Sequence, residues 1–209
     1  RELKLTVSRE LSDKIEAREK SIASVKKARQ KENKNLTKEE AQESLKPVKR
    51  DVNIPEAITI SGTGINDDGV IRNISSSTGT NIIAGPITLA AAAKINSDAN
   101  TLQFSTAGTI NTTSSSFGLT VGGAGVISAL GVISGSGVIT KIDAGSLILN
   151  AANTYTGVTN INAGFVNIQS IAALGDVIAG TTVSSGAALQ VQGDKIFAAE
   201  PITISGTGI

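Results

Sequence analysis

Apolar and polar residues follow two different periods along this chain. Four aliphatic residues recur at helical spacing near the amino end, at Leu11, Ile15, Ile22 and Val25. From about residue 56 onward, short runs of Ile, Val and Leu instead alternate with Thr, Ser and Asn. The helical spacing predicts a helix over residues 9–32, and the alternation predicts a series of short β-strands.

A second, shorter helix is indicated by Thr37 and Glu40, which have the spacing of a capping box. This helix should end before Pro47. Between the two predicted helices lies the polar sequence Lys-Glu-Asn-Lys-Asn, which interrupts the apolar pattern. We therefore expect a charged α-helical segment ahead of an all-β body.

Charge and glycine divide the chain at the same place. Residues 1–50 hold 15 of the 19 Lys and Arg residues, 9 of the 18 Asp and Glu residues and none of the 22 glycines. The first segment is therefore strongly basic, and the rest of the chain is acidic and rich in glycine. This composition predicts two domains, a charged helical segment or linker at 1–50 and a repeat region at 51–209.

Three units in the repeat region share one layout, in which a glycine is followed by an alternating strand. The glycines are Gly145, Gly164 and Gly186, about 20 residues apart. If each unit forms one turn of a coil, equivalent strands pair in parallel and their inward aliphatic side chains stack into a continuous core. Glycine suits the corners, which demand a positive φ or a close approach of the backbone. We therefore predict a parallel β-helix, a type of solenoid.

A longer duplication brackets this region. Residues 56–65 and 200–209 are identical at nine of ten positions, which indicates that a module begins again at the carboxyl end. We expect the repeat region to be truncated there and the chain to be part of a longer polypeptide. Exposed strand edges at the ends of the coil should favour self-association.

Composition excludes several classes of chemistry. The chain has no His and no Cys, so it cannot build a Ser-His-Asp or Cys-His catalytic site, a Cys/His zinc site or a disulfide framework. No apolar run reaches the roughly 18 residues of a membrane span, and the amino end lacks the apolar core of a secretory signal. Carboxylates, hydroxyls and lysines remain as candidate functional groups.

The individual candidates have simpler structural interpretations. Asp67 and Asp68 are adjacent and precede Gly69, which favours a turn over a pair of catalytic carboxylates. The sequence from Gly122 begins like a calcium-binding nonapeptide but carries Ile127 at the position of an Asp ligand. Tyr155 follows a polar turn, where its ring would cap the core at a corner. We therefore predict no catalytic, cofactor-binding or metal-binding residues and no cofactor.

Nucleic-acid binding is also not expected. The basic residues between Lys26 and Lys34 are followed closely by glutamates, and this segment has no aromatic side chain to stack on a base. A solvated linker or a coiled-coil-like spacer explains these charges better.

The stretch from Gly145 to Ile168 resembles the autotransporter-associated β-strand repeat, also called the passenger-associated transport repeat. Its central sequence is Asn-Ala-Ala-Asn-Thr-Tyr-Thr-Gly, at residues 150–157. The sequences at 173–175, 181–191 and 200–206 resemble the segments that follow in this family. The likeness extends less sharply back to Glu56, and residues 1–50 do not share it.

This resemblance implies a right-handed parallel β-helix in the passenger of a secreted or surface-exposed autotransporter. It further implies export through an outer-membrane β-barrel in the same parent chain, and a Gram-negative-type cell surface as the location. The family repeat carries no catalytic residues, so the resemblance implies a structural stalk of an adhesin, with cell-surface or self-association partners. Two alternatives remain open, a carbohydrate-active β-helix of the lyase or hydrolase type and a fibre spacer with a coiled-coil amino terminus.

Overall fold

The computed structural model describes residues 16, 18–27, 53–74, 78–113, 117–193 and 199–208. Contacts divide the chain into two compact units, Arg1–Val48 and Lys49–Ile209. In the first unit, residues 16 and 18–27 are helical and exposed, and Glu16 and Lys20 form an ion pair of 2.7 Å along the helix. This confirms the central part of the helix predicted over 9–32, whereas its ends and the predicted second helix lie outside the described residues.

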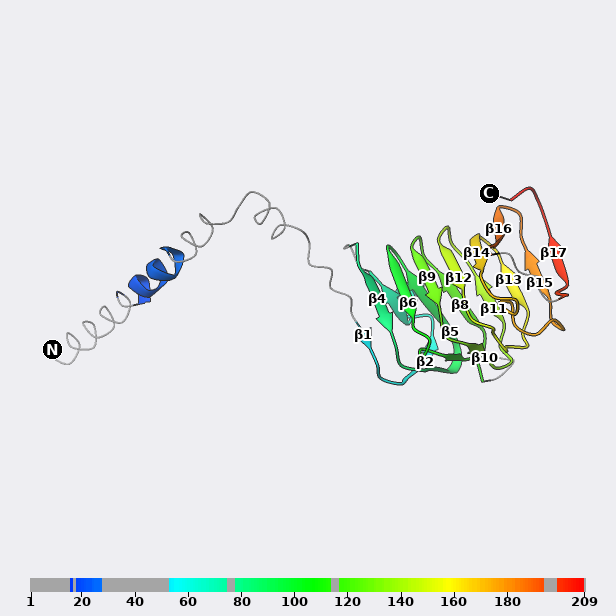
Figure 1. Ribbon diagram of the computed structural model, residues 1–209, viewed down its shortest axis with the longest axis horizontal. Helices are drawn as coiled ribbons and strands as arrows, with labels where there is room; N and C mark the ends of the chain where they lie inside the picture. Colours follow the sequence, from blue (N-terminus) through cyan, green and yellow to red (C-terminus); the bar gives the residue numbers. More distant parts are fainter. Residues whose placement is uncertain are drawn as a thin grey trace. The chain divides into compact units, whose positions relative to one another are not determined.

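The second unit consists of β-strands that pair only in parallel among the described residues (Figure 1). One sheet has seven strands: β1 (Asn53–Ile54), β4 (Thr80–Ile83), β6 (Thr101–Phe104), β9 (Val126–Ala129), β12 (Ser146–Leu149), β14 (Gly164–Ile168) and β16 (Ala187–Val191). The other has ten: β2 (Ile58–Gly62), β3 (Ile71–Asn73), β5 (Ile87–Ser97), β7 (Ile110–Asn111), β8 (Leu119–Gly122), β10 (Ile133–Ser134), β11 (Ile139–Lys141), β13 (Thr159–Ile161), β15 (Thr181–Val183) and β17 (Ile202–Ile204). A short 3-10 helix, η1 (Ile65–Asp67), separates β2 from β3.

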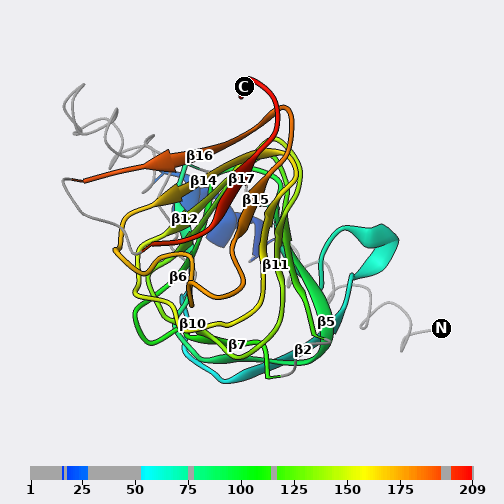
Figure 2. The same cartoon turned by 90° about the vertical axis from the view of Figure 1, so that its right-hand side faces the viewer.

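The strands coil around a common axis. Viewed from the carboxyl-terminal end in Figure 2, the chain passes from β10 at the bottom to β11 at the right and β12 at the left as it approaches the viewer. This counterclockwise path makes the coil right-handed. The prediction of a right-handed parallel β-helix with a helical amino-terminal segment is therefore confirmed.

Equivalent side chains stack directly over one another inside the coil. In the seven-stranded sheet, one inward column contains Ile83, Phe104, Ala129, Leu149 and Ile168 in register, each at most 3% exposed. Burial of an aliphatic or aromatic side chain of this size contributes roughly 1.5–3 kcal/mol relative to leaving it in water. The core is thus a set of columns along the axis, as the alternating pattern predicts.

Glycines allow the corners of successive turns to lie close together. A Cβ at Gly145 would lie 2.2 Å from the carbonyl oxygen of Gly125, and a Cβ at Gly164 would lie 2.3 Å from that of Gly145. Gly186 has open space around it but a φ of 77°, in the left-handed region that favours glycine. The corner role predicted for Gly145, Gly164 and Gly186 is therefore confirmed. The first two are required by the close approach of the preceding turn, and the third by its positive φ.

Amide side chains form a hydrogen-bonded ladder on the outside of the coil. Asn150 Nδ2 donates to Gln169 Oε1 at 2.7 Å, and Gln169 Nε2 donates to Gln192 Oε1 at 2.9 Å. These residues follow directly after β12, β14 and β16, so the ladder crosses three successive turns. It links the turns by contacts that do not depend on the apolar core.

The two copies of the duplicated motif occupy different sides of the coil. In the first copy, Ile58 and Ile60 of β2 pair with Ile87 and Leu89, at the beginning of β5. In the second copy, β17 pairs with β15, in the stack that contains β11 and β13. β5 is long enough to run along two sides, because its second half pairs with β3 and β8. Identical sequences therefore do not stand at equivalent positions of the coil.

Candidate functional site

A loop between β2 and β3 departs from the regular coil and projects from its side (Figure 2). Asn66 and Asp67 have φ values of 55° and 63°, a conformation that Asn and Asp tolerate better than most residues. The Asn-Asp-Asp-Gly sequence is therefore a tight turn, as predicted. The loop carries η1 and returns to the sheet at Val70, whose amide donates to the carbonyl of Lys94 at 2.8 Å.

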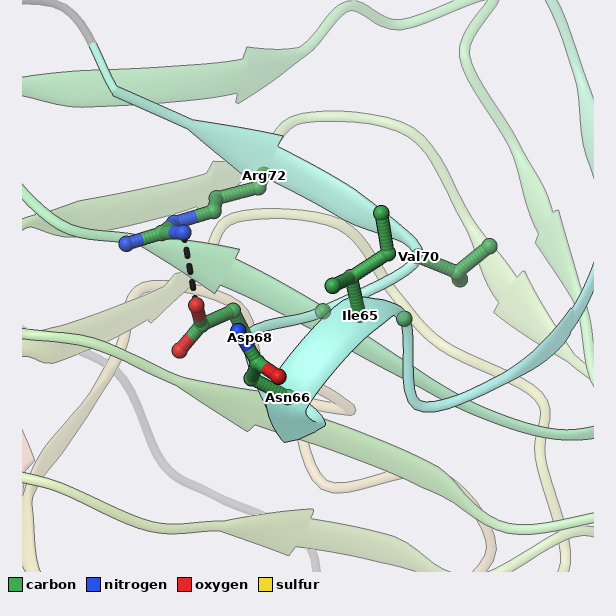
Figure 3. A pocket seen from close by; sticks show the side chains of 7 residues that line it. Ile65, Asn66, Asp68, Val70 and Arg72 are labelled. Carbon is green, nitrogen blue, oxygen red and sulfur yellow. Dashed lines mark hydrogen bonds and ion pairs between the residues drawn. The ribbon is translucent and has the colours of Figure 1, made fainter.

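This loop encloses a surface pocket of about 500 Å³ (Figure 3). Ile65 lies beside Val70 on one side of the pocket, and Asp68 faces Arg72 on the other. The side chain of Ile65 is largely exposed. The pocket also has backbone from Gly64 and Gly69 and the side chain of Asn66 in its lining.

The carboxylates around this pocket are paired with cations. Arg72 contacts the carboxylate of Asp68 through Nη1 and that of Asp98 through Nη2, both at 2.7 Å. Lys94 Nζ lies 3.2 Å from Asp67 Oδ2 and donates to the Asp67 carbonyl at 2.6 Å. The hydrogen bond from Lys94 holds the pKa of Asp67 below its ordinary value. Both adjacent aspartates therefore have structural partners and do not face each other as an acid and base pair.

Lys141 is buried inside the coil, which the sequence analysis did not identify. It occupies an inward column between Val121 and Ile161 and is 1% exposed. Its Nζ donates to the carbonyl oxygens of Ile142 and Asp143, the latter at 2.7 Å, and to that of Ala163 at 3.4 Å. Burial lowers the pKa of Lys141 to about 8, against the opposing attraction of Asp143.

Tyr155 is also fully buried, and its hydroxyl lies 2.7 Å from Thr159 Oγ1. Burial raises the pKa of Tyr155 well above its ordinary value. The ring packs under Gly175, where a Cβ would lie 3.0 Å from two ring carbons. The prediction that this ring packs over the core at a corner agrees with this burial and packing.

A carboxylate approaches the core near the last turns. Thr181 Oγ1, which is buried, donates to Glu200 Oε1 at 2.8 Å. Burial raises the pKa of Glu200, and the nearby Asp176 acts in the same direction. Glu200 and Asp176 lie late in the sequence of the coil, whereas Asp67 and Asp68 lie early in it. The two pairs of carboxylates have different hydrogen-bond and ion-pair partners.

Other aspartates of the repeat region have local roles. Asp143 Oδ2 accepts from the amide of Gly123 at 2.9 Å, and Asp176 Oδ1 accepts from that of Ile178 at 3.0 Å. Asp194 lies outside the described residues. Within the described part of the chain, no three acidic side chains gather closely enough to hold a metal ion. No helix among these residues has the length and apolar character needed to cross a membrane.

Comparison with known proteins gives one family and two relatives. Residues 139–168, from β11 to β14, match the family model of the passenger-associated-transport-repeat. The chain is 39% identical to the Adhesin BmaC autotransporter of Brucella suis biovar 1 over 70 residues, which are 34% of this chain and 2% of that protein. It is 78% identical to Translation initiation factor IF-2 of Pelagibacter ubique over 60 residues, which are 29% of this chain and 8% of that protein.

The chain therefore spans only a small part of either relative. No solved structure gives a significant match to it.

Proposed function

We propose, from the premise that this chain is an autotransporter repeat protein with a passenger-associated transport repeat, that its β-helix is the structural stalk of a surface-exposed adhesin. The observation that carries the proposal is the position of the family match. Residues 139–168 begin at β11 and end with β14, so the matched repeat includes one complete turn of the coil. The repeat and the adhesin relative point to a cell-surface or secreted location.

The geometry suits a spacer. Each turn pairs in register with the turns before and after it, and the inward columns and the outer amide ladder run from turn to turn. Such a coil can grow one turn at a time as the chain emerges from a pore, because each completed turn offers a strand edge to the next. Export through an outer-membrane β-barrel elsewhere in the parent protein belongs to this proposal.

A display experiment tests the stalk. The chain is placed between a secretion signal and the β-barrel of a characterised autotransporter in a Gram-negative host, and protease added to intact cells measures surface exposure. We expect cleavage of the displayed chain, with a fusion lacking the barrel as the protected control. Retention of the chain inside the cell, while the native passenger of the same barrel is exposed, would contradict the proposal.

Absence of catalysis is a separate part of the proposal. It is supported by the ion pairs that engage Asp67, Asp68 and Asp98 with Lys94 and Arg72. The alternative is a carbohydrate-active β-helix, which needs two carboxylates on one face and open to substrate. Incubation of the purified chain with a panel of polysaccharides distinguishes the two, and reproducible formation of shorter products would establish the enzyme.

The likeness to a translation initiation factor requires its own explanation. Translation takes place inside the cell, whereas the repeat is a feature of exported passengers. We assign this likeness mainly to the charged amino-terminal segment, which the 60 matched residues exceed by at least ten. For this segment we propose a separate domain at residues 1–50 that acts as a linker. Amplification of one continuous message across the codons for residues 45–60 tests whether the two segments belong to one protein. Failure to obtain that message would restrict the stalk proposal to the β-helix.

A further inference from the structure

The alternating pattern of this β-helix does not exclude a register error in which a strand pairs two residues away from its native position. A shift by one residue would turn the inward side chains of a strand to the solvent, but a shift by two residues returns them to the core. In the stack of β8, β11, β13 and β15, each strand has two inward positions. Thr or an aliphatic residue occupies every one of these positions except 141, which is Lys. Apolar patterning alone therefore does not distinguish the native register from one displaced by two residues.

Lys141 is the exception because its inward position depends on particular partners. The side chain lies in the column between Val121 and Ile161 and reaches the corner that follows β11. There its Nζ contacts the carbonyl oxygens of Ile142 and Asp143 in the same turn and that of Ala163 in the following turn. One ammonium group thus contacts the corners of two successive turns.

Those corners are tightly packed and hold carbonyl groups close to the core. Asp143 has a φ of 60°, and a Cβ at Gly164 would lie 2.5 Å from the Asp143 carbonyl oxygen. Buried carbonyl groups need hydrogen-bond donors, and a buried ammonium needs acceptors. Two of these acceptors belong to the lysine's own turn, so Nζ has all three only when the following turn is correctly aligned.

We propose that Lys141 fixes the register of β13 on β11 by acting as a tethered cation for the corner carbonyl oxygens of its own and the following turn. Displacement of β13 by two residues along β11 moves it by about 6.6 Å, at roughly 3.3 Å per residue. That distance removes the Ala163 carbonyl from the reach of Nζ. A displaced turn then holds a buried charge with fewer acceptors, which is strongly unfavourable.

Disulfide trapping tests this role, because the chain contains no Cys. Thr140 pairs with Asn160 across β11 and β13, so the double variant Thr140→Cys with Asn160→Cys reports the native register. Thr140→Cys with Asn162→Cys reports a displacement by two residues. Paired positions in neighbouring strands are about 5 Å apart at Cα, which permits a disulfide, whereas positions offset by two residues are too distant.

Each cysteine pair is placed in the parent chain, in Lys141→Met and in the control Ile161→Met, which changes the next buried residue of the same column. We expect the parent and the control to cross-link in the native pair and to give little product in the displaced pair. In Lys141→Met the yield of the displaced pair, relative to the native pair, should rise about tenfold or more. A change of this size corresponds to the loss of one charge-assisted hydrogen bond.

An unchanged ratio in a folded Lys141→Met would overturn the proposal. Should that variant not fold, Lys141→Thr takes its place, because Thr is accepted at the inward positions 159 and 181 and cannot reach the corner carbonyls. The same rise in the displaced product is expected from it. Loss of the fold in both variants, while Ile161→Met folds, would also overturn the proposal, since Lys141 would then be required for stability and not for alignment.

Discussion

Replacement of Gly145 by Ala tests the close stacking of the corners. The amide of Gly145 donates to the Gly123 carbonyl at 2.9 Å, and the amide of Ser146 donates to the Gly125 carbonyl at 3.0 Å. A Cβ on residue 145 would lie 2.5 Å and 2.2 Å from these same two oxygens. Because both obstacles are backbone atoms of the preceding turn, no side-chain rotation can relieve the contact, and the turns must separate by about 1 Å.

The expected loss of stability combines three effects. Overpacking of a tight interior costs typically 1–3 kcal/mol. Each of the two hydrogen bonds that the separation weakens contributes about 0.5–1.5 kcal/mol. The lower chain entropy of unfolded Ala returns about 0.4–1 kcal/mol. We therefore expect Gly145→Ala to lower the free energy of unfolding by about 1–5 kcal/mol.

Denaturant unfolding followed by circular dichroism measures this loss. Gly118→Ala is the matched control, because the nearest atom to a Cβ there is the Val138 carbonyl oxygen at 3.5 Å, an ordinary contact. The control should be as stable as the parent chain or slightly more stable. The reasoning would be refuted if Gly145→Ala unfolded at the same denaturant concentration as the parent, or if both variants lost the same stability.

Three further outcomes are expected. The folded chain holds the pKa of Lys141 at about 8, below the value of about 10.4 in the unfolded chain. The free energy of unfolding should therefore rise between these pH values by an amount on the order of 3 kcal/mol, because the unfolded chain binds the additional proton. This rise should be absent in Lys141→Met, and parallel pH profiles of the two proteins would contradict the reasoning. Tyr155→Phe removes the hydrogen bond to buried Thr159, so thermal and denaturant unfolding should show a loss of about 1–3 kcal/mol, and unchanged stability would mean that this bond contributes nothing. Ile204→Lys, on the edge strand β17, should reduce self-association in sedimentation, whereas Ile178→Lys, which is even more exposed but lies outside the strands, should not. An equal effect of both substitutions would exclude the sheet edge as the contact.

The features that were predicted from the sequence are those determined by neighbouring residues. Alternation of Ile, Val and Leu with Thr and Asn decides which side chains of a strand face inward, and this depends only on the period of the backbone. The corner roles of Gly145 and Gly164 followed from their spacing, because a coil with turns of about 20 residues needs a compact corner in each. The Asn66–Gly69 turn likewise follows from the conformational preferences of its own residues.

The features that were missed depend on contacts between turns. A lysine at an inward position contradicts the usual preference of a charged side chain for solvent, and one of the three carbonyl groups that hold Lys141 belongs to Ala163, 22 residues away in sequence. Arg72 similarly joins Asp68 in its own loop to Asp98, 26 residues further along. The different neighbours of the two copies of the duplicated motif also depend on such contacts, because β5 extends along two sides of the coil and pairs with the first copy.

Because the turns stack in parallel with a constant register, whole turns of this β-helix can be removed or added without changing which side chains face inward. Leu119 and Val121 of β8 stand over Ile139 and Lys141, which in turn stand over Thr159 and Ile161. Excision of the residues from 139 to 158 would therefore bring β8 directly onto β13, with aliphatic and hydroxyl side chains still facing inward. Recombination between such units would shorten or lengthen the β-helix in steps of about 4.8 Å, the spacing of neighbouring strands.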